Sequence, residues 1–284
     1  MRAFFVRNLK IFFRDRTSVF FSLLSAIIII GLYVLFLGNV WSGSLQGMPG
    51  VRFLMDSWIM AGLLAVTSMT TTMGAFGIMI EDKTRKISKD FYSSPISRSG
   101  LTAGYIISSY IIGVIMTLFT LILAEIYILA YGGTLLSIGS LLKMIGLILL
   151  STVTSTSFIL FIVSFFKSTN AFATASTIIG TLIGFLTGIY LPIGQLPDAV
   201  QFVIKIFPVS HAAALMRQVM MEAPLSYTFA GAPAESVAQF RQFMGVELVF
   251  GDAAVSAFTG IGILVLTAVV FFLLSMLSLS RKSK

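Results

Sequence analysis

Long apolar runs alternate along the chain with short polar stretches, and each run is near the ~20 residues that a membrane-spanning helix requires. The runs at 57–80 and 101–124 contain no charged residue at all. The pattern predicts an all-α polytopic membrane protein with six transmembrane helices, at residues 19–37, 57–80, 101–131, 144–166, 168–191 and 253–280.

The segment 1–17 is amphipathic rather than uniformly apolar. On a helical wheel Arg7, Lys10 and Arg14 fall opposite a hydrophobic side formed by Phe4, Phe5, Leu9, Ile11 and Phe12. This pattern is typical of a helix that lies in the membrane interface with its basic side toward lipid headgroups. An ordinary basic flank that only sets topology is the alternative.

The stretch before the last apolar run divides in two. Residues 192–221 are still apolar but are interrupted by Pro192, Pro197 and Pro208, which predicts two short re-entrant helices packed on the bundle. Residues 222–252 are more polar and form an extracellular insert. One short helix is expected in it, from Pro233 to Met244, with Gly245 as its stop.

Composition and charge place the chain in the membrane and orient it there. The 284 residues are 57% hydrophobic and 11% charged, with a mean hydropathy of +0.99, whereas soluble domains carry about 25% charged residues. Fourteen Lys and Arg residues lie on the side of the termini and five on the other side. This distribution predicts a plasma-membrane protein with both termini in the cytoplasm. The net charge of +8 then reflects topology and contact with anionic lipid rather than nucleic-acid binding.

Several kinds of chemistry are excluded by missing motifs. The chain has no Cys, a single His (His211), no P-loop and no HExxH or GxSxG motif. We therefore expect no cofactor bound by this chain and no ATP hydrolysis by it. Glu125 is the only acid inside a predicted span, and it falls about 36 Å along its helix, near the outer interface. The lack of a mid-membrane charge argues against ion coupling.

A charged segment, residues 81–98, interrupts the apolar pattern on the cytoplasmic side. It predicts a helix over residues 82–92 that is broken at Ser94-Pro95. Ile87, Phe91 and Ile96 are apolar residues within this charged setting. Two interpretations stay open: a docking site for a cytoplasmic partner, or a lipid-facing amphipathic linker.

Two further patterns lie within the spans, and each has a plainer alternative. Small residues recur every four positions at Ser176, Gly180, Gly184 and Gly188, which favours close helix packing, either across a dimer axis or within the subunit. The span at 57–80 combines adaptable apolar side chains with threonines. Its candidates for a substrate path, with ordinary helix packing as the alternative, are Met69, Thr72, Met73 and Phe76.

Taken together, these features resemble the ABC-2 type transporter permeases, the membrane subunits of ATP-binding cassette exporters. The resemblance rests on the six-span plan without a nucleotide-binding domain and on three stretches, RNLKIFFRDR, SSPISRSGLTAGY and YLPIGQLPDAVQFVIKIFPVSHAAALMRQ. They are similar to the family's interfacial helix, its coupling helix with the following turn, and its re-entrant helices, with Arg217 at the expected place. The insert 222–252 has no counterpart that the resemblance explains.

The resemblance implies a complex of two permease subunits, as a homodimer, with two copies of a separate ABC-type ATPase that binds ATP and Mg. In this family the second and fifth spans tend to face each other across the dimer axis. The segment 81–99 would be the coupling segment. The residues expected to contact the ATPase are Lys83, Arg85, Lys86, Asp90, Phe91 and Ile96.

The leading hypothesis is therefore an export permease that moves an amphipathic or apolar substrate outward. The alternative is an ATPase-independent transporter or channel, which would need a polar path that the spans do not show. A membrane-embedded enzyme such as a lipid transferase ranks last, because the outer acids are scattered. The insert 222–252 is expected to cover the exit as a lid.

Overall fold

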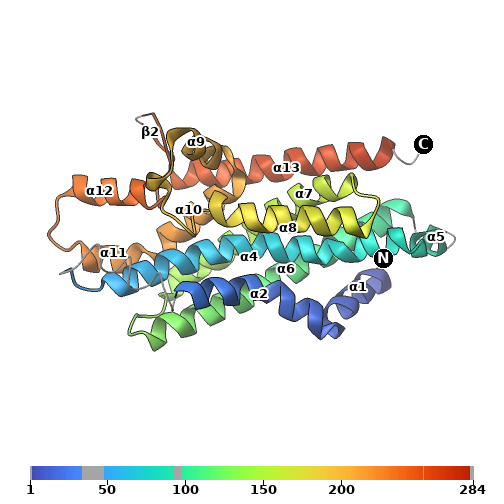
Figure 1. Cartoon of the computed structure of the whole chain (residues 1–284), viewed down its shortest axis with the longest axis horizontal. Coiled ribbons are helices and arrows are strands. Elements are labelled where there is room, and N and C mark those ends of the chain that lie inside the picture. Colours follow the sequence, from blue (N-terminus) through green and yellow to red (C-terminus); the bar gives the residue numbers. More distant parts are fainter. Residues whose placement is uncertain (1, 34–47, 93–96, 252, 282–284) are drawn as a thin grey trace.

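Helices that run along the long axis of the molecule form most of this computed structural model, which describes residues 2–33, 48–92, 97–251 and 253–281 (Figure 1). Within these residues five helices are long and apolar enough to cross a membrane by themselves. They are α4 (Val51–Thr84), α6 (Arg98–Ala130), α7 (Ile138–Ser164), α8 (Thr169–Leu186) and α13 (Ala257–Arg281). The prediction of an all-α polytopic membrane protein is confirmed at this level.

The predicted span 19–37 lies partly outside the described residues. Its described part is α2 (Arg16–Leu32), which follows α1 (Arg2–Arg14) after a bend of 73°. Asp15 makes the bend possible, because its carboxylate accepts hydrogen bonds from the backbone N–H groups of Thr17 and Ser18 and caps α2. A hydrogen bond from the Ser18 hydroxyl lowers the pKa of Asp15, which keeps the cap ionised. The interfacial helix thus ends at Arg14 rather than at residue 17.

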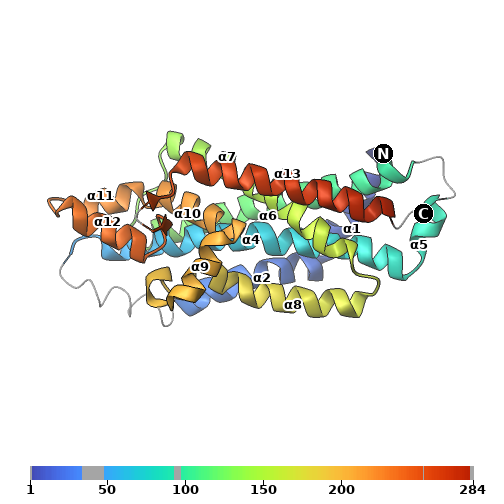
Figure 2. The same cartoon turned by 90° about the horizontal axis from the view of Figure 1, so that it is seen from above.

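The central helix of the bundle is α4, with α2, α6, α7, α8 and α10 packed around it (Figures 1 and 2). Its 34 residues span about 51 Å, well beyond the ~30 Å hydrocarbon core. Trp58, Leu63, Met69 and Phe76 are fully buried along it. By contrast α13 exposes Phe258 and a row of aliphatic side chains, as expected of a lipid-facing helix. α4 is therefore the element that connects the two ends of the molecule.

Several helix boundaries differ from the sequence prediction, and three of the differences have a local reason. α4 begins at Val51 rather than at residue 57, because Arg52 and Asp56 are one turn apart and pair at 3.7 Å within the helix. α13 begins at Ala257 rather than 253, because β2 (Ala253–Ala254) pairs antiparallel with β1 (Val249–Phe250). α7 begins before residue 144, at Ile138, where the Ser137 hydroxyl caps its first turn.

The predicted span 168–191 is also shorter than expected, since α8 ends at Leu186. Gly188 adopts φ +64°, and the N–H groups of Gly188 and Ile189 bond to the carbonyls of Phe185 and Gly184. This pairing is a Schellman motif, which ends a helix with glycine in the left-handed conformation. Gly188 therefore does not continue the helical stripe of Ser176, Gly180 and Gly184.

The two short helices predicted in 192–221 are present as α9 (Asp198–Ile206) and α10 (Pro208–Met220), bent by 86°, after a 3-10 turn η2 (Ile193–Gln195). In the insert, α12 (Ala234–Phe243) confirms the expected helix, and Gly245 ends it at φ +66°. α11 (Glu222–Thr228) was not expected. Its Pro224 lies in the first helical turn, where proline is tolerated.

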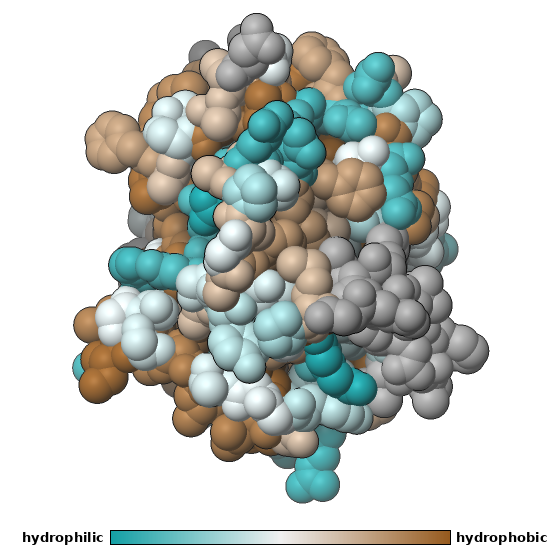
Figure 3. Space-filling model, turned by 90° about the vertical axis from the view of Figure 1, so that its left-hand side faces the viewer, coloured by the Kyte–Doolittle hydropathy of each residue, from teal (hydrophilic) through white to brown (hydrophobic). Residues whose placement is uncertain are grey.

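The two ends of the bundle are formed by different elements. The termini, α1 and α5 (Ile87–Tyr92) lie at one end, and α11, α12 and the β-strands lie at the other (Figure 1). Viewed from the α11–α12 end, the surface mixes hydrophilic and hydrophobic side chains, with brown hydrophobic ones along its left and lower edges (Figure 3).

Candidate functional site

The end of the molecule that carries the charged segment is built around an ion pair between α1 and α4. Arg7 donates two parallel hydrogen bonds to the carboxylate of Asp82, at 2.7 Å from Nη1 and 2.8 Å from Nη2. Tyr105 of α6 donates its hydroxyl to the same carboxylate at 2.7 Å. Asp82 is 3% exposed. The hydrogen bonds to Asp82 raise the pKa of Arg7, which keeps its guanidinium charged.

Aromatic rings enclose this ion pair and bring in α5. The Arg7 guanidinium lies 4.9 Å from the ring centroid of Phe91 and 5.7 Å from that of Phe4. Phe4 packs edge-on against Phe91 at 5.0 Å and against Tyr105 at 4.9 Å. Four elements, α1, α4, α5 and α6, therefore meet at one point. We call Phe4, Arg7, Asp82, Phe91 and Tyr105 the α1–α5 junction.

A close helix contact fixes α1 against α6 beside this junction. Gly104 faces Phe4, and a Cβ atom at Gly104 would lie 2.5 Å from Cδ1 of the Phe4 ring. One turn along α1, the buried Asn8 donates to the Ser108 hydroxyl at 3.3 Å. Phe4, Asn8 and Phe12 form the buried face of α1. Arg7, one of the three residues of the predicted basic face of α1, thus binds Asp82 of the protein, and a contact of the other two with lipid stays a prediction.

The charged segment differs from the predicted helix over residues 82–92. α4 continues to Thr84, the chain turns at Arg85 and Lys86, and α5 begins at Ile87. Lys86 has φ +61°, a left-handed conformation that a non-glycine residue rarely adopts. The turn redirects the chain so that Phe91 reaches back onto Arg7 and Phe4.

The residues predicted to contact an ATPase fall into two groups. Arg85, Lys86 and Asp90 are exposed, with Arg85 paired to Glu81 at 2.7 Å. Lys83 and Phe91 instead face the protein, because Lys83 donates to the carbonyl of Phe166 at 2.7 Å and Phe91 belongs to the junction. Ile96 lies outside the described residues. Their role in docking stays a prediction.

The candidate path residues are buried in the subunit core. Met69, Thr72, Met73 and Phe76 are each 3% exposed or less. Thr72 donates to the carbonyl of Ser68 and lies against Gly113 of α6. A substrate path along these residues stays a prediction.

The small residues of α8 lie in two different environments, one packed within the subunit and one open. Gly184 is covered by Tyr190 of the same chain, as packing within the subunit requires, and Ser176 donates to the carbonyl of Phe172. Among the described residues, Gly180 has no atom within 4 Å of the position of a Cβ, and Ala173 and Thr177 on the same side of α8 are exposed. This open face of small side chains leaves room for another helix, and the dimer stays a prediction.

At the opposite end, Arg217 has a structural role that sequence reasoning did not assign. It is fully buried on α10, donates to the carbonyls of Gly188 (3.2 Å) and Gly245 (3.3 Å), and stacks on Trp58 at 4.8 Å. Trp58 in turn donates to the carbonyl of Met244 at 2.7 Å. The guanidinium thus joins α4, α10 and two glycine turns. The available signal was an arginine in the otherwise apolar stretch after Pro208.

The described residues contain no group of three or more His, Asp or Glu that could hold a metal ion. The fold and the junction define a helical bundle with several membrane-spanning candidates, whose charged segment is held by α1. Residues 51–277 match the model of the ABC-2 family transporter protein, so the chain belongs to the ABC-2 family. No curated protein matches the chain in sequence. It is a multi-pass membrane component of an ABC transporter, and family membership implies association with an ABC ATPase.

Proposed function

We propose that this chain is the permease subunit of an ATP-driven exporter in the plasma membrane, with both termini in the cytoplasm and six spans. It moves an amphipathic or apolar substrate outward. A separate ATPase docks on residues 81–98, and the exposed side chains of Arg85, Lys86 and Asp90 make the first contact. Two permease subunits and two ATPase subunits complete the transporter.

The α1–α5 junction is the observation that carries the proposal. A force applied to α5 reaches Phe91, and Phe91 contacts both Phe4 and Arg7 of α1. Arg7 binds Asp82 in the last turn of α4, the central helix. Closure of the ATPase is therefore transmitted to α1 and α4 together, because a buried bidentate pair resists being pulled apart.

The long central helix gives this movement a route to the opposite end. α4 runs without a break from Asp82 back to Trp58, which contacts Arg217 and the Met244 carbonyl. The insert 222–252 is fixed to the bundle through these contacts and covers the outer end. We propose that it acts as a lid that follows α4, and its deletion should change export.

ATP turnover tests the proposal. The purified permease and its co-purified ATPase, reconstituted in proteoliposomes, should hydrolyse ATP faster than the ATPase alone. The variant F91A, which removes the ring that joins α5 to Arg7, should abolish this stimulation. F258A, which removes an 86% exposed ring on α13, is the control and should leave it unchanged. Transport that persists after ATP depletion would instead favour the ATPase-independent transporter.

A further inference from the structure

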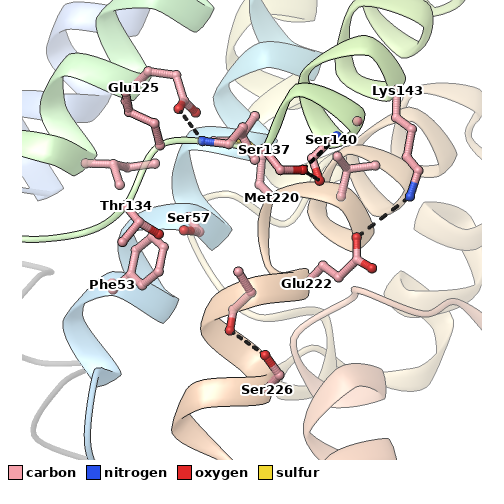
Figure 4. Close-up of a pocket in the computed structure, with 16 residues that line it drawn as sticks. Phe53, Ser57, Glu125, Thr134, Ser137, Ser140, Lys143, Met220, Glu222 and Ser226 are labelled. Atoms are coloured by element: carbon pink, nitrogen blue, oxygen red, sulfur yellow. Dashed lines mark hydrogen bonds and ion pairs between the residues drawn. The ribbon is translucent and has the colours of Figure 1, made fainter.

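A cavity of about 560 Å³ lies at the end opposite to the charged segment, between α4, α6, α7 and the α10–α11 region (Figure 4). Its apolar walls include Phe53, Ile128 and Met220, and its polar side includes Ser57 and Glu125. Protein sites for small organic ligands have volumes of about 300–1,000 Å³ and combine apolar walls with a few polar groups. The cavity has the size and composition of such a site.

Two buried polar atoms of residues that line this cavity have no hydrogen-bond partner among the residues that the structure describes. Glu125 accepts a hydrogen bond from the backbone N–H of Leu136 through Oε2, at 3.0 Å, as Figure 4 shows. Its other oxygen, Oε1, is buried and accepts none, and the same is true of Oγ of Ser57. A buried polar atom without a partner is costly, because it has lost its hydrogen bonds to water and gained none in return. A ligand that donates hydrogen bonds to both atoms would recover this cost.

The charges around the cavity select the kind of donor. The pair between Lys143 and Glu222 is loose, at 3.9 Å, and each side chain is 63% exposed, so solvent weakens it. Among the described residues no cation pairs with Glu125, so burial makes its ionised form costly, and a charged donor would offset that cost. A primary ammonium supplies three N–H donors and one positive charge, which match Oε1 of Glu125 and Oγ of Ser57.

We propose that this cavity binds an amphipathic organic ammonium. Its N–H groups donate to Glu125 and Ser57, and its apolar body packs against Phe53, Ile128 and Met220. The site lies at the other end of the molecule from the α1–α5 junction, and binding there does not depend on an ATPase.

Equilibrium binding of radiolabelled 2-phenylethylammonium to the full chain in lipid nanodiscs tests this inference. Binding should be saturable and should be displaced by the unlabelled amine. Neither 2-phenylethanol, which lacks the charge, nor 3-phenylpropionate, which carries the opposite charge, should displace it at the same concentration. Equal displacement by the alcohol would overturn the proposal, because the cavity would then recognise only an apolar body.

Matched variants separate the site from membrane partitioning. E125Q keeps the shape of the side chain and its contact with Leu136, and should weaken binding about tenfold through loss of the charge-assisted hydrogen bond. S57A should weaken it about threefold. E235Q, at an exposed acid on α12, is the control and should bind like the wild type. Saturable binding that E125Q and S57A leave unchanged, or no saturable binding at all, would overturn the assignment. If E125Q does not fold, S57A and the competitor series still decide the question.

Discussion

Arg7 and Asp82 are 75 residues apart in the chain, and their side chains meet through two hydrogen bonds of 2.7 and 2.8 Å. The pair joins the interfacial helix to the last turns of the central helix. Phe91 of α5 covers the guanidinium, so the contact between α1 and α4 is also a contact with the charged segment. In the proposed transporter, this relationship links an ATPase docked on the charged segment to the helices of the bundle.

Loss of either Arg7 or Asp82 should destabilise the protein, because each substitution removes the same ion pair. D82N leaves Arg7 without a carboxylate and should lower the free energy of unfolding by about 1–3 kcal/mol, as expected for a hydrogen bond to a charged group. R7Q should have a similar effect. The double variant R7Q/D82N should lose less than the sum of the two, because each single variant removes the same pair. Thermal unfolding in detergent measures the three Tm shifts, and strictly additive shifts would show that the two residues act independently.

Gly104 should tolerate no side chain, because the Phe4 ring occupies the space. G104A should displace α1 from α6, lower Tm by a few degrees and reduce permease-stimulated ATP turnover. G146A on α7 is the matched control, since no atom of the described residues lies within 4 Å of its Cβ position. There alanine should be neutral or slightly stabilising, by up to about 1 kcal/mol. A G104A protein with normal stability and normal coupling would contradict the close contact.

Arg217 should be replaceable by lysine only at a considerable cost. R217K keeps the charge but loses the planar fork that reaches the carbonyls of both Gly188 and Gly245 and stacks on Trp58. We expect a loss of about 3 kcal/mol or more, since a buried charge would lack its partners. Limited proteolysis should then cleave the insert 222–252 faster than in the wild type. The half-exposed Arg241 offers a control, and R241K should leave both readouts nearly unchanged.

The open face of α8 leads to a prediction about assembly. G180L adds a bulky side chain where the subunit itself leaves space, so the single subunit should fold normally. If two permeases pair through α8, this variant should be monomeric by native mass spectrometry while the wild type is dimeric. G146L adds the same side chain at another open position and should remain dimeric. A dimeric G180L protein would place the dimer interface elsewhere.

Much of the fold follows from local patterns in the sequence. The apolar runs predict the long helices, the prolines predict the break between α9 and α10, and Gly245 predicts the end of α12. The errors arise where a tertiary contact outweighs a local signal. Arg52 and Asp56 are charged, so the sequence pattern places them before a membrane span. In the structure they pair with each other and lie inside α4.

The junction was harder to predict than the helices that form it. The composition of the charged segment suggests that all of its residues face the cytoplasm. In the structure Asp82 and Phe91 both face the protein. Arg7 forms an ion pair with Asp82, and its guanidinium stacks on the ring of Phe91. No local pattern relates residue 7 to residue 82. The left-handed turn at Lys86 belongs to the same arrangement, because this turn brings Phe91 back to α1.

The central claim is that a separate ATPase docks on residues 81–98. Its most direct test is to isolate the full chain from its native membrane in mild detergent and to identify the co-purifying proteins by mass spectrometry. The account predicts a stoichiometric P-loop ATPase, which the charge reversal R85E/K86E removes and the reversal K205E, at the opposite end, retains. Recovery of the chain alone, or only with its own copy, would contradict the account and favour a transporter that needs no ATPase.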